Sequence, residues 1–82
     1  MVVSPTYGAM PVGKFYETLF ADTLSADVKV RSIYRATCDA SRWIAHFDYR
    51  WARRSVPEVA VQIIDLFEIQ DGLIHELRIV FA

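Results

Sequence analysis

An apolar stripe of helical period marks the first third of the chain. Its members recur three and four positions apart and are Val12, Phe15, Tyr16, Leu19, Phe20 and Leu24. Lys14, Glu17 and Asp22 fall on the opposite face, so the spacing predicts one amphipathic helix. Pro11 suits the first helical turn, where its missing N–H loses no hydrogen bond. Residues 5–8 predict a turn before this helix, and residues 25–27 are expected to end it.

Beyond the helix, apolar and polar residues alternate with the period of two that is typical of half-buried strands. The segments that show this pattern are residues 28–38, 42–51, 59–69 and 73–81. The second has the strictest alternation, with one face made by Trp43, Ala45, Phe47, Tyr49 and Trp51. In the first, the apolar face is expected to carry Val28, Val30, Tyr34, Ala36 and Cys38. Together with the helix, these segments predict an α+β domain with a curved antiparallel sheet.

The Asp71-Gly72 pair predicts a hairpin between the last two segments, and two registers are open. A two-residue loop would place Asp65 opposite Arg78 and mix polar with apolar residues on both faces. A three-residue loop that includes Gln70 would pair Asp65 with Leu77. It would also gather one apolar face, made by Val61, Ile63, Phe67, Leu77, Ile79 and Phe81. Because register follows the hydrophobic pattern wherever a face is buried, we favour the three-residue loop.

Asp65 is the one carboxylate on that apolar face. An ionised carboxylate there is costly, so we expect a raised pKa and a group that is neutral near pH 7. A neutral carboxylic acid can donate a hydrogen bond to a developing oxyanion. The alternative is that Asp65 reaches water or an arginine and serves only the structure.

Composition sets the remaining limits. The 82 residues allow one domain, 1–82, yet 54% of them are hydrophobic, which is more apolar surface than so small a body hides. We therefore expect a small hydrophobic ligand and a homodimer as partners. The net charge is −1 and the acidic and basic residues are interspersed, so the sequence has no stripe of basic residues that would bind nucleic acid. No apolar run is long enough for a membrane span and no signal peptide is evident, so we expect a cytoplasmic protein.

The other candidate residues carry little chemistry. Cys38 is the only cysteine, which rules out an internal disulfide, and we expect it to be a small buried residue. His46 falls on a polar face, where it is solvated or at a dimer interface. His75 shares the face of Asp65 and is a weak candidate for a general base. The two histidines lack a metal-ligand spacing, so neither a metal nor another cofactor is expected.

Several strings in this order and spacing resemble the second half of bacterial ketosteroid isomerase. They are Pro5-Thr6-Tyr7-Gly8, Phe15-Tyr16, Trp43 through Phe47-Asp48-Tyr49, Ile64-Asp65-Leu66-Phe67, Asp71-Gly72, and Leu77-Arg78-Ile79-Val80-Phe81. The resemblance covers nearly the whole chain, with about five extra residues around Ser55. Similar cones belong to the wider nuclear transport factor 2-like and SnoaL-like superfamily. The resemblance implies a cystatin-like cone, present here in part.

The resemblance also implies roles for single residues. Asp65 matches the protonated aspartic acid of the oxyanion hole, and ketosteroid isomerase is a standard case of a carboxylic acid kept neutral. Tyr16 matches a tyrosine that supports the principal oxyanion-hole tyrosine, although it could equally be plain core. The residues expected to line the substrate pocket are Trp43, Phe47, Ile63, Phe67, Leu77 and Phe81. The implied activity is double-bond isomerisation of a hydrophobic carbonyl compound through an enolate.

Two parts of the isomerase pattern have no match in the sequence. The catalytic base would lie just before Met1, and the principal tyrosine would lie farther upstream. On this resemblance the domain is N-terminally incomplete, and without a base there is no proton shuttle. The alternative function is therefore a non-catalytic module of the same fold, which binds a hydrophobic ligand or dimerises. The outer face of the sheet would then form the interface, with Arg42, His46, Ile64, Leu66 and Arg78 on it.

Overall fold

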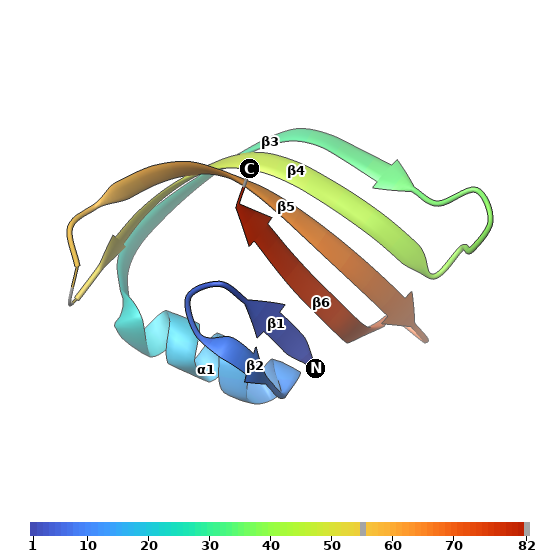
Figure 1. Cartoon of the computed structure of the whole chain (residues 1–82), viewed down its shortest axis with the longest axis horizontal. Helices are drawn as coiled ribbons and strands as arrows, with labels where there is room; N and C mark the ends of the chain where they lie inside the picture. Colours follow the sequence, from blue (N-terminus) through green and yellow to red (C-terminus); the bar gives the residue numbers. More distant parts are fainter. Residues whose placement is uncertain (55, 82) are drawn as a thin grey trace.

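The structure, a computed structural model, describes residues 1–54 and 56–81. These residues form one helix and six strands: β1 (Val2–Ser4), β2 (Gly8–Met10), α1 (Val12–Asp22), β3 (Thr23–Arg35), β4 (Arg42–Arg53), β5 (Val59–Gln70) and β6 (Leu73–Phe81). The strands make a single sheet in the order β2-β1-β6-β5-β4-β3, and only the β1–β6 pair is parallel. Strands β3 to β6 arch over α1 and over the β1–β2 hairpin, which continues the sheet beyond β6 (Figure 1). The predicted α+β class with a curved, mainly antiparallel sheet is confirmed.

The helix is shorter than the sequence predicts at its end. Pro11 precedes the first turn rather than lying in it, and its carbonyl accepts the hydrogen bond from the Phe15 N–H at 2.9 Å. The helix ends at Asp22 and not at residues 25–27, because Thr23 is extended and its hydroxyl donates to the Leu19 carbonyl at 2.7 Å. An early end suits a β-branched threonine, which loses side-chain freedom in a helix.

The first ten residues form a hairpin that the sequence predicts only as a turn. Ser4 Oγ accepts a hydrogen bond from the Tyr7 N–H at 2.9 Å, and Gly8 has φ +73°, a conformation that favours glycine. The hairpin brings Val2 alongside β6, where Val2 is fully buried. Val2, Phe15 and Leu77 form the centre of the core, at the place where α1 crosses β1 and β6.

A β-bulge changes the faces of β3. The register with β4 shifts between Val30 and Ser32, so Ile33 lies opposite Ala45, on the face of Val28 and Val30. The prediction that the even positions keep one face as far as Cys38 is therefore wrong beyond Val30. The strand ends at Arg35.

Two residues differ from expectation as a consequence. Tyr34 lies opposite Ile44 on the outer face of the sheet, which faces away from α1. Cys38 lies beyond the end of β3 and is exposed, so the prediction of a buried cysteine is also wrong.

The β5–β6 hairpin combines a two-residue loop with a bulge. Asp71 and Gly72 have φ of 54° and 76°, and Gln70 pairs with Leu73. A register shift next to Glu68 then leaves one extra residue, His75, on β6. Asp65 consequently pairs with Ile79, so the predicted three-residue loop and the Asp65–Leu77 pair are wrong.

The predicted apolar face of this hairpin is nevertheless retained. A two-residue loop without a bulge would pair Asp65 with Arg78, a three-residue loop would pair it with Leu77, and the bulge pairs it with Ile79. Leu77 and Ile79 are two residues apart on β6 and lie on the same face, so both registers place the same residues on the inner face of the sheet. Ile63 and Leu77, which are 5% and 2% exposed, therefore share the inner face of the sheet with Asp65 and Ile79.

Candidate functional site

Asp65 lies in the middle of β5 on the inner, concave face of the sheet. Its neighbours across the strands are Ala45 on β4 and Ile79 on β6. Its Oδ1 atom is buried and has no hydrogen-bond partner among the described residues. Buried polar atoms of this kind are rare because each one costs free energy to remove from water. The hydrogen-bonding capacity of this oxygen is therefore unused among the described residues.

The concave face and α1 line a partly open cavity of about 180 Å³ beside this carboxylate. Strands β4, β5 and β6, the helix, and the turn after β1 all contribute to its walls. Seven of the sixteen described lining residues are aromatic, namely Tyr7, Phe15, Tyr16, Phe47, Tyr49, Trp51 and Phe81. Asp65 is the single carboxylate in the described lining, and no Lys, Arg or His takes part in it.

Burial in these apolar surroundings raises the pKa of Asp65 from 3.8 to about 6. Removal from water penalises the ionised form, and the described lining offers no cation to compensate. Both protonation states are therefore accessible close to neutral pH. Below pH 6 the side chain is mainly a neutral acid and can donate a hydrogen bond, whereas above it the carboxylate is mainly an acceptor.

Two tyrosines face the same carboxylate from different elements. Burial, and then the negative charge of Asp65, raise the pKa of both Tyr16 on α1 and Tyr49 on β4. Both hydroxyls therefore stay protonated at neutral pH and can donate hydrogen bonds to a ligand. The sequence predicts a site role for Tyr16 but not for Tyr49. The signal for Tyr49 is its position in the strict alternation, on the same face as Phe47.

Tyr7 and Trp51 use their polar atoms within the protein and present ring surface to the cavity. The Tyr7 hydroxyl donates to Asp22 Oδ2 at 2.6 Å, and Trp51 Nε1 donates to Thr23 Oγ1 at 2.8 Å. Burial, followed by the hydrogen bond and charge of Asp22, raises the pKa of Tyr7 to about 12. Tyr7 also contacts Trp51 edge-on, with ring centroids 6.2 Å apart. The sequence predicts only a turn at Tyr7, because its partner lies fifteen residues away.

The structure brings together most of the predicted site residues. Phe47, Ile63, Leu77 and Phe81 line the cavity with Asp65 and Tyr16. Trp43 lies farther along β4 with the Arg35 guanidinium 5.4 Å from its ring centroid. Phe67 packs against the core around Val2, Phe15 and Leu77.

The histidines lie away from the cavity. His46 is on the outer face, with Nε2 3.0 Å from Gln62 Oε1, and His75 is exposed at the bulge of β6. Within residues 1–54 and 56–81, no group of three His, Cys, Asp or Glu side chains is placed to hold a metal ion. The helix of the described chain is too short and too polar to cross a membrane.

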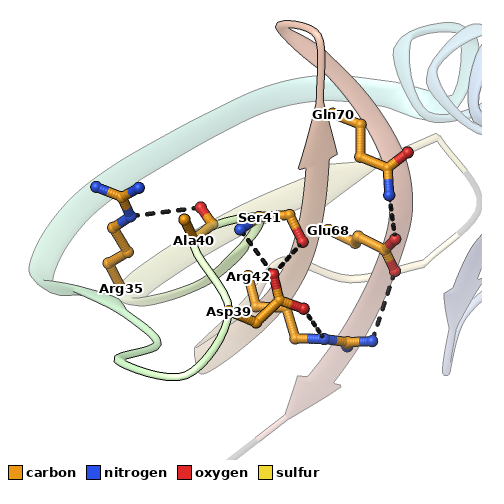
Figure 2. A network of polar contacts seen from close by, with 7 residues as sticks. All are labelled: Arg35, Asp39, Ala40, Ser41, Arg42, Glu68 and Gln70. Carbon is orange, nitrogen blue, oxygen red and sulfur yellow. Dashed lines mark hydrogen bonds and ion pairs between the residues drawn. The ribbon is translucent and has the colours of Figure 1, made fainter.

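A polar network joins the β3–β4 turn to the end of β5. Figure 2 shows Arg42 between two carboxylates, with Nε 3.2 Å from Asp39 Oδ2 and Nη2 3.6 Å from Glu68 Oε2. Ser41 donates two hydrogen bonds to Asp39, which together with Arg42 hold the pKa of Asp39 below its ordinary value. Gln70 donates to Glu68 at 2.8 Å. Arg42, expected at a dimer interface, therefore already has two acidic partners within its own chain.

Comparison with solved structures shows what fold these elements form. A protein of ketosteroid isomerase-like fold from Catenulispora acidiphila, crystallised in complex with trimethylamine, matches 99% of this chain with a TM-score of 0.77 and 17% identity. A nuclear transport factor 2-like protein of unknown function from Burkholderia pseudomallei matches 99% of it with a TM-score of 0.75 and 9% identity. The chain has the nuclear transport factor 2-like fold. The predicted superfamily resemblance is thereby supported at the level of the fold.

The chain is shorter than the two proteins whose fold it shares. It spans 65% of the Catenulispora chain and 68% of the Burkholderia chain. No protein-family model matches the sequence, and no curated protein matches it either.

Proposed function

We propose that the chain binds a small hydrophobic carbonyl compound, with protonated Asp65 donating a hydrogen bond to the carbonyl oxygen. The observation that carries this proposal is the buried Oδ1 atom of Asp65, which has no hydrogen-bond partner among the described residues, beside a mainly apolar cavity with seven aromatic residues in its described lining. A ligand oxygen there would satisfy an atom that is otherwise unsatisfied, while the rings bury the apolar part of the ligand.

The same contact would stabilise an enolate. As negative charge develops on a carbonyl oxygen, a hydrogen bond from a neutral acid in a dry site becomes stronger. Tyr16 and Tyr49 would support Asp65, since both hydroxyls stay protonated. The described lining holds no second carboxylate and no histidine, so the base for a double-bond isomerisation would have to come from outside this lining. Binding with an oxyanion-type hydrogen bond is the part of the isomerase chemistry that this chain can supply.

A second candidate ligand is a small organic ammonium ion. Aromatic faces attract cations, and an ionised Asp65 would neutralise the positive charge. The Catenulispora protein of the same fold was crystallised in complex with trimethylamine, which supports a small amine as a ligand class for such a cavity. This candidate requires the carboxylate form of Asp65, whereas a carbonyl oxygen, which only accepts hydrogen bonds, requires the acid form.

The two candidates predict opposite effects of pH. The affinities for 2-acetylnaphthalene, a ketone without a hydrogen-bond donor, and for tetramethylammonium should be measured by calorimetry between about pH 5 and pH 8, on either side of the Asp65 pKa of about 6. If the carbonyl proposal holds, binding of the ketone weakens about tenfold as pH rises, the equivalent of one hydrogen bond. If the ammonium candidate holds, tetramethylammonium binding strengthens over the same range.

Two variants and a control sharpen this test. Asp65→Leu should weaken binding of the ketone about tenfold at low pH, because the donor is lost. Asp65→Asn keeps an N–H donor at every pH and should make binding of the ketone independent of pH, while it should abolish ammonium binding. Asp48→Asn, on the outer face, should leave both affinities unchanged. Equal affinity for the ketone in wild type and Asp65→Leu would refute the role of Asp65.

A further inference from the structure

Strand β3 forms one edge of the sheet and is exposed on both faces over most of its length. All eight residues from 24 to 31 are exposed, including Leu24, Val28 and Val30, which are 60%, 57% and 55% accessible. An edge strand presents unpaired N–H and C=O groups that can pair with another strand. Apolar side chains on so open an edge indicate a surface that another chain covers.

The regular part of β3 is short and carries a simple charge pattern. Register shifts interrupt the strand after Thr23 and after Val30, which leaves Ser25 to Val30 as an even run. Within it, Val28 and Val30 face the concave side, and Asp27 and Lys29 face the outer side. None of the ion pairs among the described residues uses Asp27 or Lys29.

This charge pattern permits one antiparallel pairing of β3 with a second copy of itself. With Val28 on the two-fold axis, Asp27 of each copy lies opposite Lys29 of the other, and Ala26 lies opposite Val30. A shift by two residues in one direction places Asp27 opposite Asp27, and in the other direction it places Lys29 opposite Lys29. Opposite charges across strands stabilise pairing and like charges oppose it, so only the first register is favourable.

We propose that two copies of the chain pair through β3 around Val28 and continue the sheet across a two-fold axis. A symmetric contact of this kind is isologous, so each favourable charge pair occurs twice. Val28 also lines the cavity, so the partner strand would lie beside the cavity of each copy, about 4.8 Å from β3. The pairing does not depend on the ligand proposed above, and either proposal can fail without the other.

Charge reversal tests the register by sedimentation velocity. Asp27→Lys and Lys29→Asp each give positions 27 and 29 the same sign, so each variant alone should dimerise roughly tenfold more weakly or worse. Mixed in equal amounts, the two variants become complementary and should form a heterodimer. The doubly reversed variant should regain the wild-type dimer. A monomeric wild type, dimers that persist in the single variants, or a mixture that stays monomeric would each overturn the proposal.

A cysteine cross-link tests the two-fold axis itself, in a Cys38→Ser background that removes the exposed native thiol. Residues directly opposite in an antiparallel pair lie roughly 4.5–5.5 Å apart, which a disulfide can span. Val28→Cys should therefore form a covalent dimer on mild oxidation. Val30→Cys is almost equally exposed but would place its two thiols roughly 14 Å apart, so it should remain unlinked. Cross-linking of both variants alike, or of neither, would contradict this interface.

Discussion

The raised pKa of Asp65 makes a specific prediction about stability and pH. Because the folded state holds this proton more tightly than the unfolded chain, folding is favoured where Asp65 is protonated. Stability from this group is fully present below 3.8, its ordinary pKa, and is lost as pH rises through the folded value of about 6. The whole pKa shift corresponds to a change of about 3 kcal/mol in the free energy of unfolding. The Asp65 side chain is only half-buried, so water weakens this effect and we expect a change of about 1–2 kcal/mol.

Urea denaturation of wild type and Asp65→Asn between about pH 4 and pH 8 measures this term. The asparagine variant lacks the titration, and the other carboxylates contribute equally to both proteins. The difference in the free energy of unfolding should therefore isolate Asp65: relative to wild type, the variant should gain about 1–2 kcal/mol as pH rises from 4 to 7. Asp71→Asn, at the exposed hairpin loop, should follow wild type throughout. A difference between wild type and Asp65→Asn that stays constant with pH would refute the buried, uncompensated carboxylate.

Three further substitutions test the fold that positions the cavity, each measured by chemical denaturation. Phe15→Ala should destabilise the protein by about 3–5 kcal/mol, because Phe15 lies in the core and is 3% exposed. Phe20 is 72% exposed, so Phe20→Ala should change stability by less than about 0.5 kcal/mol. Equal effects of the two substitutions would contradict the assignment of the buried helix face. Tyr7→Phe should lose about 1–2 kcal/mol with its hydrogen bond to Asp22, and an unchanged stability would show that this bond contributes nothing. Gly72→Ala should cost about 1 kcal/mol because residue 72 has φ +76°, and a neutral result would argue against the two-residue hairpin loop.

The sequence predicts the faces of the sheet better than its registers. Alternation along residues 42–51 places Phe47 and Tyr49 on the inner face, and the apolar pattern of the last two strands places Asp65 there as well. These assignments succeed because burial of one face is a local, repeated signal. The exact partner of Asp65 was not predictable, since the bulge at His75 depends on how β6 follows the curvature of its neighbour.

Contacts between distant segments explain the remaining differences. Residues 5–8 read as an ordinary turn, yet Tyr7 reaches Asp22 and becomes part of the cavity wall. Trp43 has the inner-face alternation of Phe47, but it lies farther along the curved strand, next to Arg35. The end of α1 depends partly on Arg54, whose backbone and side chain donate to the carbonyls of Asp22 and Ala21 at 2.9 Å. None of these contacts has a local sequence signal.

The most direct test of the central claim is an NMR titration of the Asp65 side-chain carboxyl carbon, with and without 2-acetylnaphthalene, whose carbonyl oxygen can only accept a hydrogen bond. The proposed site predicts a pKa near 6 in the free protein, and a higher value when a neutral acceptor occupies the cavity and favours the protonated acid. An ordinary pKa near 3.8 that does not respond to the ligand would contradict Asp65 as the anchor of the site.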